Sequence, residues 1–237
     1  MKDELTIIVP IFNEEESLPA FFLEMDKFVQ ACPITAKILL VNDGSTDSSP
    51  ALIKDKCGQA VQYKALFLDG NYGLSTAIKA GIDHCTTTLI GYIDADLQTH
   101  PADFLPYLDF FPEYDMVNGI RQNRQDSLVK KISSKIANKY RRFMINDNIE
   151  DSCCPLKIMK TDRAKALPFF TGMHRFLPAL IQLQGGTVKQ LPITHSPRYA
   201  GTAKYHLHNR LIGPFFDILA FRWMRSRYIS YTTAPLS

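Results

Sequence analysis

Two carboxylates and an amide follow an apolar run at close spacing. The segment is Asp94-Ala95-Asp96-Leu97-Gln98, directly after the strand-like run at residues 89–93. Carboxylates at positions i and i+2, with an amide oxygen two residues later, suit a hard divalent cation such as Mg²⁺ or Mn²⁺. Such a cation completes its shell with water and substrate phosphates. The alternative is a solvated acidic turn that caps a helix beginning near Pro101.

Two further polar segments also follow predicted strands. One is Pro10-Ile11-Phe12-Asn13-Glu14, and the other is VNDGSTD at residues 41–47. Because ligands of open α/β sheets bind beyond the carboxyl ends of the strands, these groups are placed to hydrogen-bond a base and a ribose. Each segment taken alone also fits an ordinary strand-to-helix turn. The sequence has no G-x-G-x-x-G and no Walker A pattern, so a dinucleotide or P-loop mechanism is unsupported.

The elements that must position these segments alternate between strand and helix patterns in the first half. Strands separated by helices of about ten residues imply βαβ units and a mainly parallel α/β sheet. The predicted strands are 5–9, 38–41, 63–68, 89–93 and 116–119, and the predicted helices are 15–30, 45–56, 74–84 and one opening at Pro101.

The second half has a more mixed pattern. We expect a cysteine-rich turn at 151–156 and a loop at 197–205 that is rich in glycine and basic residues. No internal repeat or Pro/Gly linker separates the halves, so one compact domain is expected. The predicted helices of this half are 127–144, 162–167, 174–184 and 207–227, and the predicted strand is 188–193.

Composition narrows the class of protein. The chain has 237 residues, of which 46% are hydrophobic and 22% charged, as in globular proteins. No signal peptide fits the start, and no stretch reaches the roughly 18 apolar residues that span a bilayer. The five cysteines are odd in number and include no C-x-x-C pair, so neither a disulfide framework nor a zinc cluster is indicated. A reduced, cytoplasmic setting is expected.

Charge is divided unevenly along the chain. Residues 1–110 hold 7 Lys and Arg against 16 Asp and Glu, whereas residues 111–237 hold 20 against 8. One half therefore suits a cation and the other suits anions. Segment 121–142 alone has 8 basic residues and a single acid, Asp126. It is either a solvated helix face or a surface for phosphates and anionic lipids. No motif supports nucleic acid as a partner.

The predicted helix at 207–227 also has two interpretations. Its apolar residues recur at helical spacing, so it can pack on the core. Alternatively it lies in a membrane interface, with Trp223 among arginines at the headgroups: Arg222, Arg225 and Arg227.

Taken together, these segments resemble the family 2 glycosyltransferases of GT-A fold, in the polyprenyl-phosphate branch that includes dolichol-phosphate mannose synthases. The similarity extends over nearly the whole chain. The matching segments are IIVPIFNEEESL (7–18), VNDGSTDSS (41–49), GNYGLSTAIKAGI (70–82), IDADLQTHP (93–101), NGIR (118–121), DSCCPLK (151–157), GMHRFLPAL (172–180) and HSPRYAGTAKY (195–205).

The resemblance implies a role for each matching position. Nucleotide-binding positions are Pro10, Phe12, Glu14 and Asp43, and Asp94 belongs to the donor diphosphate and metal region. The cation, Mg²⁺ or Mn²⁺, is expected on Asp96 and Gln98. Catalytic positions are Asp94 and Asp96, with Arg121 near the transferred group and Arg198 and Lys204 on the phosphates. The acceptor phosphate is expected near Lys131 and Ser134.

Four departures from the family pattern stand out. Phe12 takes the place of a frequent tyrosine, so a hydroxyl contact is lost. The turn Ser152-Cys153-Cys154-Pro155 replaces a more usual Gly-Cys turn. Thr202-Ala203-Lys204 replaces a common Gly-x-Ser-Lys pattern, and the C-terminal transmembrane helices of many relatives have no counterpart.

The expected fold is therefore GT-A, a mainly parallel Rossmann-like sheet flanked by helices with a mixed basic C-terminal extension. The glycosyltransferase domain is expected at 1–205, with a nucleotide-sugar and metal half (1–120) and an acceptor half (121–205). An amphipathic helix and tail follow at 206–237.

The expected reaction is metal-dependent, inverting transfer of one hexose from a nucleotide sugar to polyprenyl phosphate. GDP-mannose is favoured over UDP-glucose or another UDP-sugar as donor. The setting is the cytoplasmic face of a membrane, with the protein bound peripherally by its own surface or through a membrane protein partner. The acceptor phosphate is already ionised near neutral pH, its second pKa being about 6, so no general base is needed.

Three alternatives remain open. A soluble glycosyltransferase acting on a glycan or protein hydroxyl would need a carboxylate base near the sugar. A sugar-nucleotide nucleotidyltransferase would need a glycine-rich basic loop, where this chain has the acidic segment 12–14. A non-catalytic membrane adaptor is disfavoured because Asp94, Asp96 and Gln98 are all present.

Overall fold

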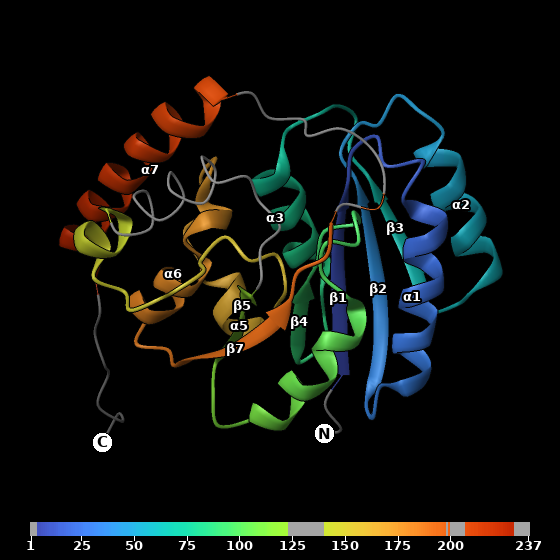
Figure 1. Ribbon diagram of the computed structural model, residues 1–237, viewed down its shortest axis with the longest axis horizontal. Coiled ribbons are helices and arrows are strands. Elements are labelled where there is room, and N and C mark those ends of the chain that lie inside the picture. Colours follow the sequence, from blue (N-terminus) through green and yellow to red (C-terminus); the bar gives the residue numbers. More distant parts are fainter. Residues whose placement is uncertain (1–3, 123–139, 198, 200–206, 230–237) are drawn as a thin grey trace, which may run out of the picture.

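The computed structural model describes residues 4–122, 140–197, 199 and 207–229. Within these residues the chain forms a seven-stranded sheet in the order β3-β2-β1-β4-β6-β5-β7 (Figure 1). All neighbouring strands are parallel except where β6 pairs antiparallel with β4 and β5. The strands are β1 Glu4–Ile11, β2 Thr35–Asn42, β3 Tyr63–Phe67, β4 Leu89–Tyr92, β5 Met116–Gln122, β6 Lys157–Lys160 and β7 Val188–Thr194. The predicted mainly parallel α/β sheet is confirmed.

Helices cover both faces of this sheet. The predicted helix 74–84 is confirmed at its predicted bounds, whereas the predicted helix 15–30 begins later, at Leu18. The first turn is lost because residues 13–15 hydrogen-bond to the next loop instead. The helices are α1 Leu18–Ala31, α2 Ser49–Gln59, α3 Leu74–His84, the 3-10 helix η1 Pro101–Phe110, α5 Thr161–Lys165, the 3-10 helix η2 Met173–Arg175, α6 Leu177–Leu183 and α7 Leu207–Arg227.

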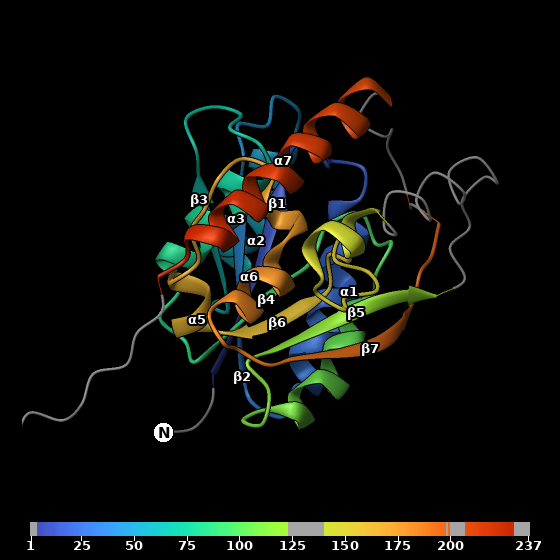
Figure 2. The same cartoon turned by 90° about the vertical axis from the view of Figure 1, so that its left-hand side faces the viewer.

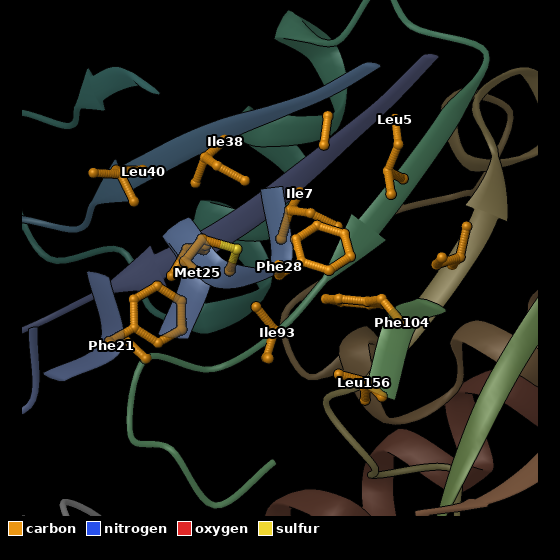
Figure 3. Packing of buried hydrophobic residues seen from close by; sticks show 14 of the residues in the cluster. Leu5, Ile7, Phe21, Met25, Phe28, Ile38, Leu40, Ile93, Phe104 and Leu156 are labelled. Carbon is orange, nitrogen blue, oxygen red and sulfur yellow. The ribbon is translucent and has the colours of Figure 1, made fainter. Parts of the chain in front are cut away.

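Alternation along β1 divides the core into two layers. Ile7 and Val9 face one side of the sheet and Ile8 faces the other, as the two-residue period of a strand requires. On the first side, Phe21 and Phe28 of α1 pack against the sheet beside η1 (Figure 3). The second layer contains buried residues of α3, α6 and α7. Both faces of β1 are therefore buried, which explains its continuous apolar run.

The strand β6 was not predicted from the sequence. Its four residues, Lys-Ile-Met-Lys, are too few and too polar at their ends to give a strand pattern. The strand forms because β4 and β5 leave a place between them, where Ile158 and Met159 are fully buried. Lys157, its first residue, pairs in register with Tyr92 of β4 and with Asn118 of β5. A buried lysine thus lies at the carboxyl edge of the parallel strands.

The helix α7 lies at the periphery of the molecule, outside α6 (Figures 1 and 2). Ile218 and Phe221 are buried in the second core layer, and the Phe221 ring stacks on Phe176 at 5.5 Å between centroids. Arg225 donates to the backbone oxygen of Ile145, which lies in the helical segment described at residues 140–145. One face of α7 therefore packs on the protein, as the first of the two interpretations requires.

Candidate active site

The loops after β1 and β2 are joined by reciprocal hydrogen bonds. The Asn13 N–H donates to Ser45 Oγ at 3.0 Å, and the Thr46 N–H donates to Asn13 Oδ1 at 2.8 Å. The Glu14 N–H donates to Ser49 Oγ at 2.9 Å. Asn13 has a φ of +52°, a left-handed conformation that asparagine tolerates. The two polar segments singled out in the sequence therefore form one structural unit.

This unit brings together the residues predicted to bind the nucleotide. Pro10 pairs in register with Val41 in the parallel ladder of β1 and β2. Phe12 and Glu14 follow on the loop, and both are partly buried. Asp43 lies just beyond β2, and its N–H donates to the Ile11 oxygen at 2.8 Å. Their predicted contacts with a nucleotide stay predictions.

The carboxylate of Asp43 also fixes a third loop. Its Oδ1 accepts the Tyr72 N–H and its Oδ2 accepts the Gly73 N–H, each at 2.8 Å. Gly44, with φ +67°, lies so close to this loop that a Cβ atom there would be 2.4 Å from the backbone carbon of Gly70. Only glycine fits such a close backbone approach at positive φ. Asp43 therefore sets the position of the loop that leads into α3.

Asp94 lies beyond β4 and is held by Tyr92. The Tyr92 hydroxyl donates to Asp94 Oδ1 at 2.7 Å. Burial and then the negative charge of Asp96 raise the pKa of Asp94 to about 6, against the opposing effects of the Tyr92 hydrogen bond and the Arg121 charge. Two carboxylates that disfavour each other's ionisation in this way form a site that a cation would stabilise.

The next turn of the loop is organised around Asp96. Its buried side chain accepts the Gln98 N–H through Oδ1 at 3.1 Å, and Leu97 between them has a φ of +57°. The Ser196 N–H donates to the Gln98 oxygen at 3.0 Å, and the Tyr199 N–H donates to the Asp96 oxygen at 3.4 Å. The segment after β7 thus lies against the loop that carries both carboxylates.

The alternative of a helix-capping acidic turn is not what the structure shows. The residue that caps η1 is His100, and the cap has no side-chain hydrogen bond. Asp94 and Asp96 instead hydrogen-bond to Tyr92 and to Gln98, as described above. Asp94, Asp96 and Gln98 therefore lie on the loop that follows β4, at the carboxyl edge of the sheet.

The donor set fits a divalent cation that also binds phosphate. Among the described residues, no group of three or more His, Cys, Asp or Glu side chains is placed to hold a metal ion. Mg²⁺ and Mn²⁺ are commonly held by one or two carboxylates together with substrate phosphates and water. Asp94, Asp96 and Gln98 supply such a partial oxygen shell, and they lack the softer ligands that select zinc.

Arg121, the predicted basic residue near the transferred group, forms a two-point ion pair with Asp151. Its Nε donates to Oδ2 at 2.7 Å and its Nη2 donates to Oδ1 at 2.8 Å. Burial alone would raise the pKa of Asp151, but the Arg121 guanidinium holds it below its usual range. Arg121 lies near the carboxyl end of β5, and its positive charge opposes the rise in the pKa of Asp94.

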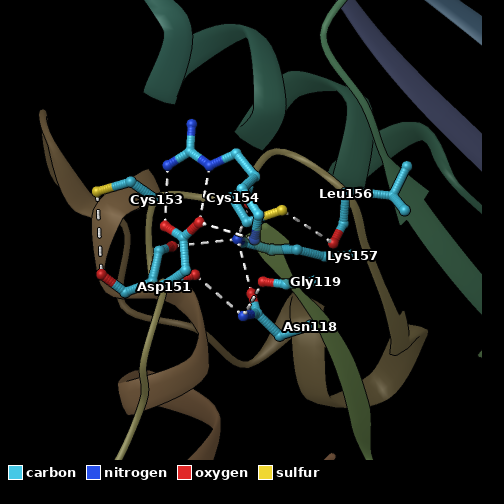
Figure 4. Close-up of polar contacts among 9 residues, drawn as sticks. Asn118, Gly119, Asp151, Cys153, Cys154, Leu156 and Lys157 are labelled. Carbon is cyan, nitrogen blue, oxygen red and sulfur yellow. Dashed lines mark hydrogen bonds and ion pairs between the residues drawn. The ribbon is translucent and has the colours of Figure 1, made fainter. Parts of the chain in front are cut away.

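Sequence reasoning missed the network around Asp151. The segment 151–156 was interpreted as a cysteine-rich turn, yet its backbone is tied to Asn118 and Lys157 (Figure 4). The available signal was charge: Asp151 and Lys157 bracket an otherwise uncharged segment that is almost wholly buried. All five cysteines of the chain are free.

Four predicted site residues lie outside the described residues. These are Arg198 and Lys204 for the donor phosphates, and Lys131 and Ser134 for the acceptor phosphate. Their roles stay predictions. The described neighbours Ser196 and Tyr199 do bond to the loop of Asp96 and Gln98, so the chain on both sides of Arg198 reaches this part of the site.

The fold and the site together define a glycosyltransferase-type domain of GT-A fold. Two solved structures match this fold at 13% and 16% sequence identity. Glucosyl-3-phosphoglycerate synthase from Mycobacterium tuberculosis has a TM-score of 0.69 over 97% of this chain and 81% of that chain. Mannosyl-3-phosphoglycerate synthase from Rubrobacter xylanophilus has a TM-score of 0.70 over 95% and 75%. The expected GT-A fold with a mainly parallel sheet flanked by helices is confirmed, whereas the expected basic C-terminal extension stays a prediction.

The chain belongs to glycosyl transferase family 2, whose pattern matches residues 6–167. Relatives in bacteria include undecaprenyl-phosphate 4-deoxy-4-formamido-L-arabinose transferases. The protein from Klebsiella pneumoniae (strain 342) is 30% identical over 91% of this chain, and that from Sodalis glossinidius is 32% identical over 92%. These matches cover 66% and 67% of the relatives, so the chain spans about two thirds of their length. The expected resemblance to the polyprenyl-phosphate branch is confirmed.

Proposed function

We propose that this protein transfers one hexose from a nucleotide sugar to polyprenyl phosphate. The observation that carries the proposal is the placement of Asp94, Asp96 and Gln98 on one loop at the carboxyl edge, where Tyr92 donates to Asp94 and Asp96 accepts the Gln98 N–H. Relatives named as undecaprenyl-phosphate transferases support the acceptor class. The domain limits are proposed as predicted: 1–205 for the glycosyltransferase domain and 206–237 for the C-terminal helix and tail.

Asp96 and Gln98 are proposed to hold Mg²⁺ or Mn²⁺, with Asp94 at the donor diphosphate. A divalent cation bound there stabilises negative charge on the departing nucleoside diphosphate. Structures of the Mycobacterium tuberculosis synthase with Mn²⁺ and UDP-glucose, and of a Pyrobaculum calidifontis mannosyltransferase with GDP-mannose and Mn²⁺, support this assignment. The Pyrobaculum chain matches with a TM-score of 0.66 at 14% identity, over 98% of this chain and 66% of that one.

The acceptor is proposed to attack without a protein base. A phosphate monoester is largely ionised at neutral pH, because its second pKa is about 6. The carboxylates of the site have other partners: Asp151 binds Arg121 in two places, and Glu14 Oε2 accepts the Ser17 hydroxyl at 3.0 Å. These pairings favour an acceptor that arrives already charged over a sugar or protein hydroxyl that must lose its proton.

Positive charge from several residues is proposed to bring the two anionic substrates together. Arg121 is proposed to act near the transferred sugar, and the predicted roles of Arg198 and Lys204 on the donor phosphates are retained. Lys131 and Ser134 are retained for the acceptor phosphate. The surplus of basic residues in the second half of the chain supports these roles, since both substrates carry phosphate.

Membrane contact is proposed through the outer face of α7 and the adjoining helix 140–145. Phe143, Phe216 and Trp223 are 82%, 63% and 68% exposed, and the exposed Arg142 and Arg222 flank them. Aromatic and arginine side chains are suited to the headgroup region of a bilayer. Within the part of the chain that the structure describes, every helix is too short or too polar to cross a membrane. We propose a peripheral position at the cytoplasmic face, on the strength of the exposed aromatic and arginine side chains of this surface.

The donor is tested by a panel of nucleotide sugars assayed with a short polyprenyl phosphate and Mg²⁺ or Mn²⁺. The panel contains GDP-mannose, UDP-glucose and a nucleotide 4-deoxy-4-formamido-L-arabinose, the last because of the names of the relatives. We expect one donor to give a lipid product whose mass increases by one sugar residue, with GDP-mannose favoured. Absence of any glycolipid product across the panel would contradict the proposed function.

A further inference from the structure

A fully buried lysine supports the turn at 151–156 from within the protein. Lys157 Nζ donates to Asn118 Oδ1 at 2.8 Å, to the Ser152 oxygen at 3.1 Å and to the Cys154 oxygen (Figure 4). An ammonium group has three N–H donors, and here each has an acceptor. Burial lowers the pKa of Lys157, yet this set of acceptors matches the charged form.

Asn118 completes the attachment of the turn to β5. While its Oδ1 accepts from Lys157, its Nδ2 donates to the Gly119 oxygen at 2.9 Å and to the Asp151 oxygen at 3.0 Å. Both ends of the amide are therefore used, which leaves a single orientation for this side chain. Asn118, which Lys157 holds in place, therefore fixes the position of the Asp151 backbone.

The carboxylate of Asp151 in turn fixes Arg121. It accepts Nε and Nη2 of the guanidinium at 2.7 and 2.8 Å, and it accepts the Arg121 backbone N–H at 3.2 Å. The two side chains are only 14% and 10% exposed. A two-point pair between planar groups restricts rotation of the guanidinium far more than a single contact does. The Nη1 group is the part of the guanidinium that this pair does not use.

The cluster of Arg121, Asp151 and Lys157 carries a net positive charge. Arg121 and Lys157 are two cations, and Asp151 is the one anion between them. The cluster lies beside the loop of the two carboxylates, because Lys157 pairs in register with Tyr92, whose hydroxyl donates to Asp94. A cation held in place before substrate arrives stabilises developing negative charge better than one that must reorient.

We propose that Asp151 is a positioning residue that holds the Arg121 guanidinium against the reacting end of the donor, with Lys157 and Asn118 fixing the turn that carries it. This inference rests on the proposed function, because the anion that Arg121 meets is taken to be a nucleotide-sugar donor. It assigns a task to a turn in which Cys154 contributes its backbone oxygen to Lys157.

The test is a double-mutant cycle of Asp151→Asn and Arg121→Ala, with Asp115→Asn as the matched control. The Asp115 carboxylate also accepts from a lysine, Lys160, and from the backbone N–H of Thr187, but Asp115 precedes β5 and so lies at the opposite end of that strand from Arg121. We expect Asp151→Asn to lower kcat by about tenfold or more, with nucleoside diphosphate affinity changed by less than about threefold. In the Arg121→Ala background, Asp151→Asn should cause little further loss of kcat. The control should lose stability and keep kcat.

Two outcomes would overturn the proposal: wild-type kcat in Asp151→Asn, or full additivity with Arg121→Ala. Should Asp151→Asn not fold, Arg121→Lys tests the same point, because lysine keeps the charge but cannot form the two-point pair. Its kcat should also fall at least about tenfold.

Two further measurements, which need no lipid acceptor, distinguish a failure of this inference from a failure of the proposed acceptor. Donor hydrolysis by water is measured without any lipid and should show the same non-additive loss. NMR exchange of the Arg121 Nε–H, which needs no substrate, should be slow in the wild type and at least about tenfold faster in Asp151→Asn. An Nε–H that exchanges rapidly in the wild type would contradict the held geometry whichever acceptor is used.

Discussion

The hydroxyl of Tyr92 donates a 2.7 Å hydrogen bond to Oδ1 of Asp94, two residues further along the chain. Tyr92 is itself buried at the end of β4, opposite Lys157. Tyr92, a residue of the rigid sheet, therefore orients the carboxylate of Asp94 in the proposed metal and diphosphate region. Sites built on strands in this way hold their geometry better than sites built on loops alone.

Loss of this hydroxyl should weaken the site without unfolding the protein. We predict that Tyr92→Phe lowers the affinity for a nucleoside diphosphate with Mn²⁺ by about tenfold, since one hydrogen bond to a charged group contributes about 1.5 kcal/mol. Isothermal titration calorimetry measures this directly. Tyr107→Phe is the control, because the buried Tyr107 hydroxyl has no hydrogen-bond partner among the residues that the structure describes. Equal affinity in wild type and Tyr92→Phe would show that Tyr92 does not orient Asp94.

Two glycines provide a matched test of the nucleotide side. Gly44 has a φ of +67° and a backbone neighbour where its Cβ would lie, whereas Gly58, in α2, has nothing within 4 Å of that position. We predict that Gly44→Ala destabilises the protein by more than about 1 kcal/mol and impairs nucleotide binding. Gly58→Ala should stabilise it by about 0.5–1 kcal/mol. Chemical denaturation of both variants provides the comparison, and an equal effect of the two substitutions would be inconsistent with the structure.

The partly buried imidazole of His174 should make stability depend on pH. Its Nδ1 lies 2.8 Å from Ser75 Oγ, and burial, followed by the charges of Arg175 and Lys157, lowers its pKa to about 3. Below the ordinary value of 6.5 the unfolded chain binds a proton that the folded protein does not. The free energy of unfolding therefore falls as pH drops from 6.5 towards 3, by at most about 1.4 kcal/mol per pH unit from this group.

Replacement of His174 should remove this contribution. We predict that, as the pH is lowered from 7 to 5, the free energy of unfolding falls by about 2 kcal/mol less in His174→Gln than in the wild type. The exposed His84 provides the control, and His84→Gln should follow the wild-type curve. Urea denaturation at several pH values gives the curves. Parallel curves for His174→Gln and wild type would argue against a neutral buried imidazole.

Much of the fold follows from the sequence alone, because its central elements are buried on both faces. The run at 5–9 is apolar except for Thr6, which favours a buried strand, and the apolar face of α3 gave its bounds directly. The loop of Asp94, Asp96 and Gln98 was also predictable, since all three residues are close in the chain and follow an apolar strand.

What escaped prediction depends on contacts between distant segments. The pair of Arg121 and Asp151 joins residues 30 positions apart, and no spacing rule indicates it. Lys157 is a lysine at 0% exposure, contrary to the usual preference of that residue for the surface. Its burial becomes understandable only when β6 is placed between β4 and β5, where three oxygens surround the ammonium.

The exposed aromatic residues of α7 give a prediction about lipid binding. We expect the protein to float with vesicles that contain anionic lipid, and to do so less as salt rises, because polybasic attraction is screened. Phe216→Ser with Trp223→Ser should reduce the fraction bound at high salt by several-fold. Val61→Ser is the control, since Val61 is 93% exposed beside the opposite edge of the sheet. No flotation at low salt would contradict direct docking and would favour recruitment by a membrane partner.

The central claim is that a phosphate, and no hydroxyl, accepts the sugar. The most direct measurement compares polyprenyl phosphate with the polyprenol of the same chain length, using the preferred donor and product mass as the readout. We expect glycolipid from the phosphate alone, and at least about a hundredfold less from a folded Asp96→Asn variant, since the cation site is lost. Equal transfer to the polyprenol, or undiminished transfer by Asp96→Asn, would contradict the account.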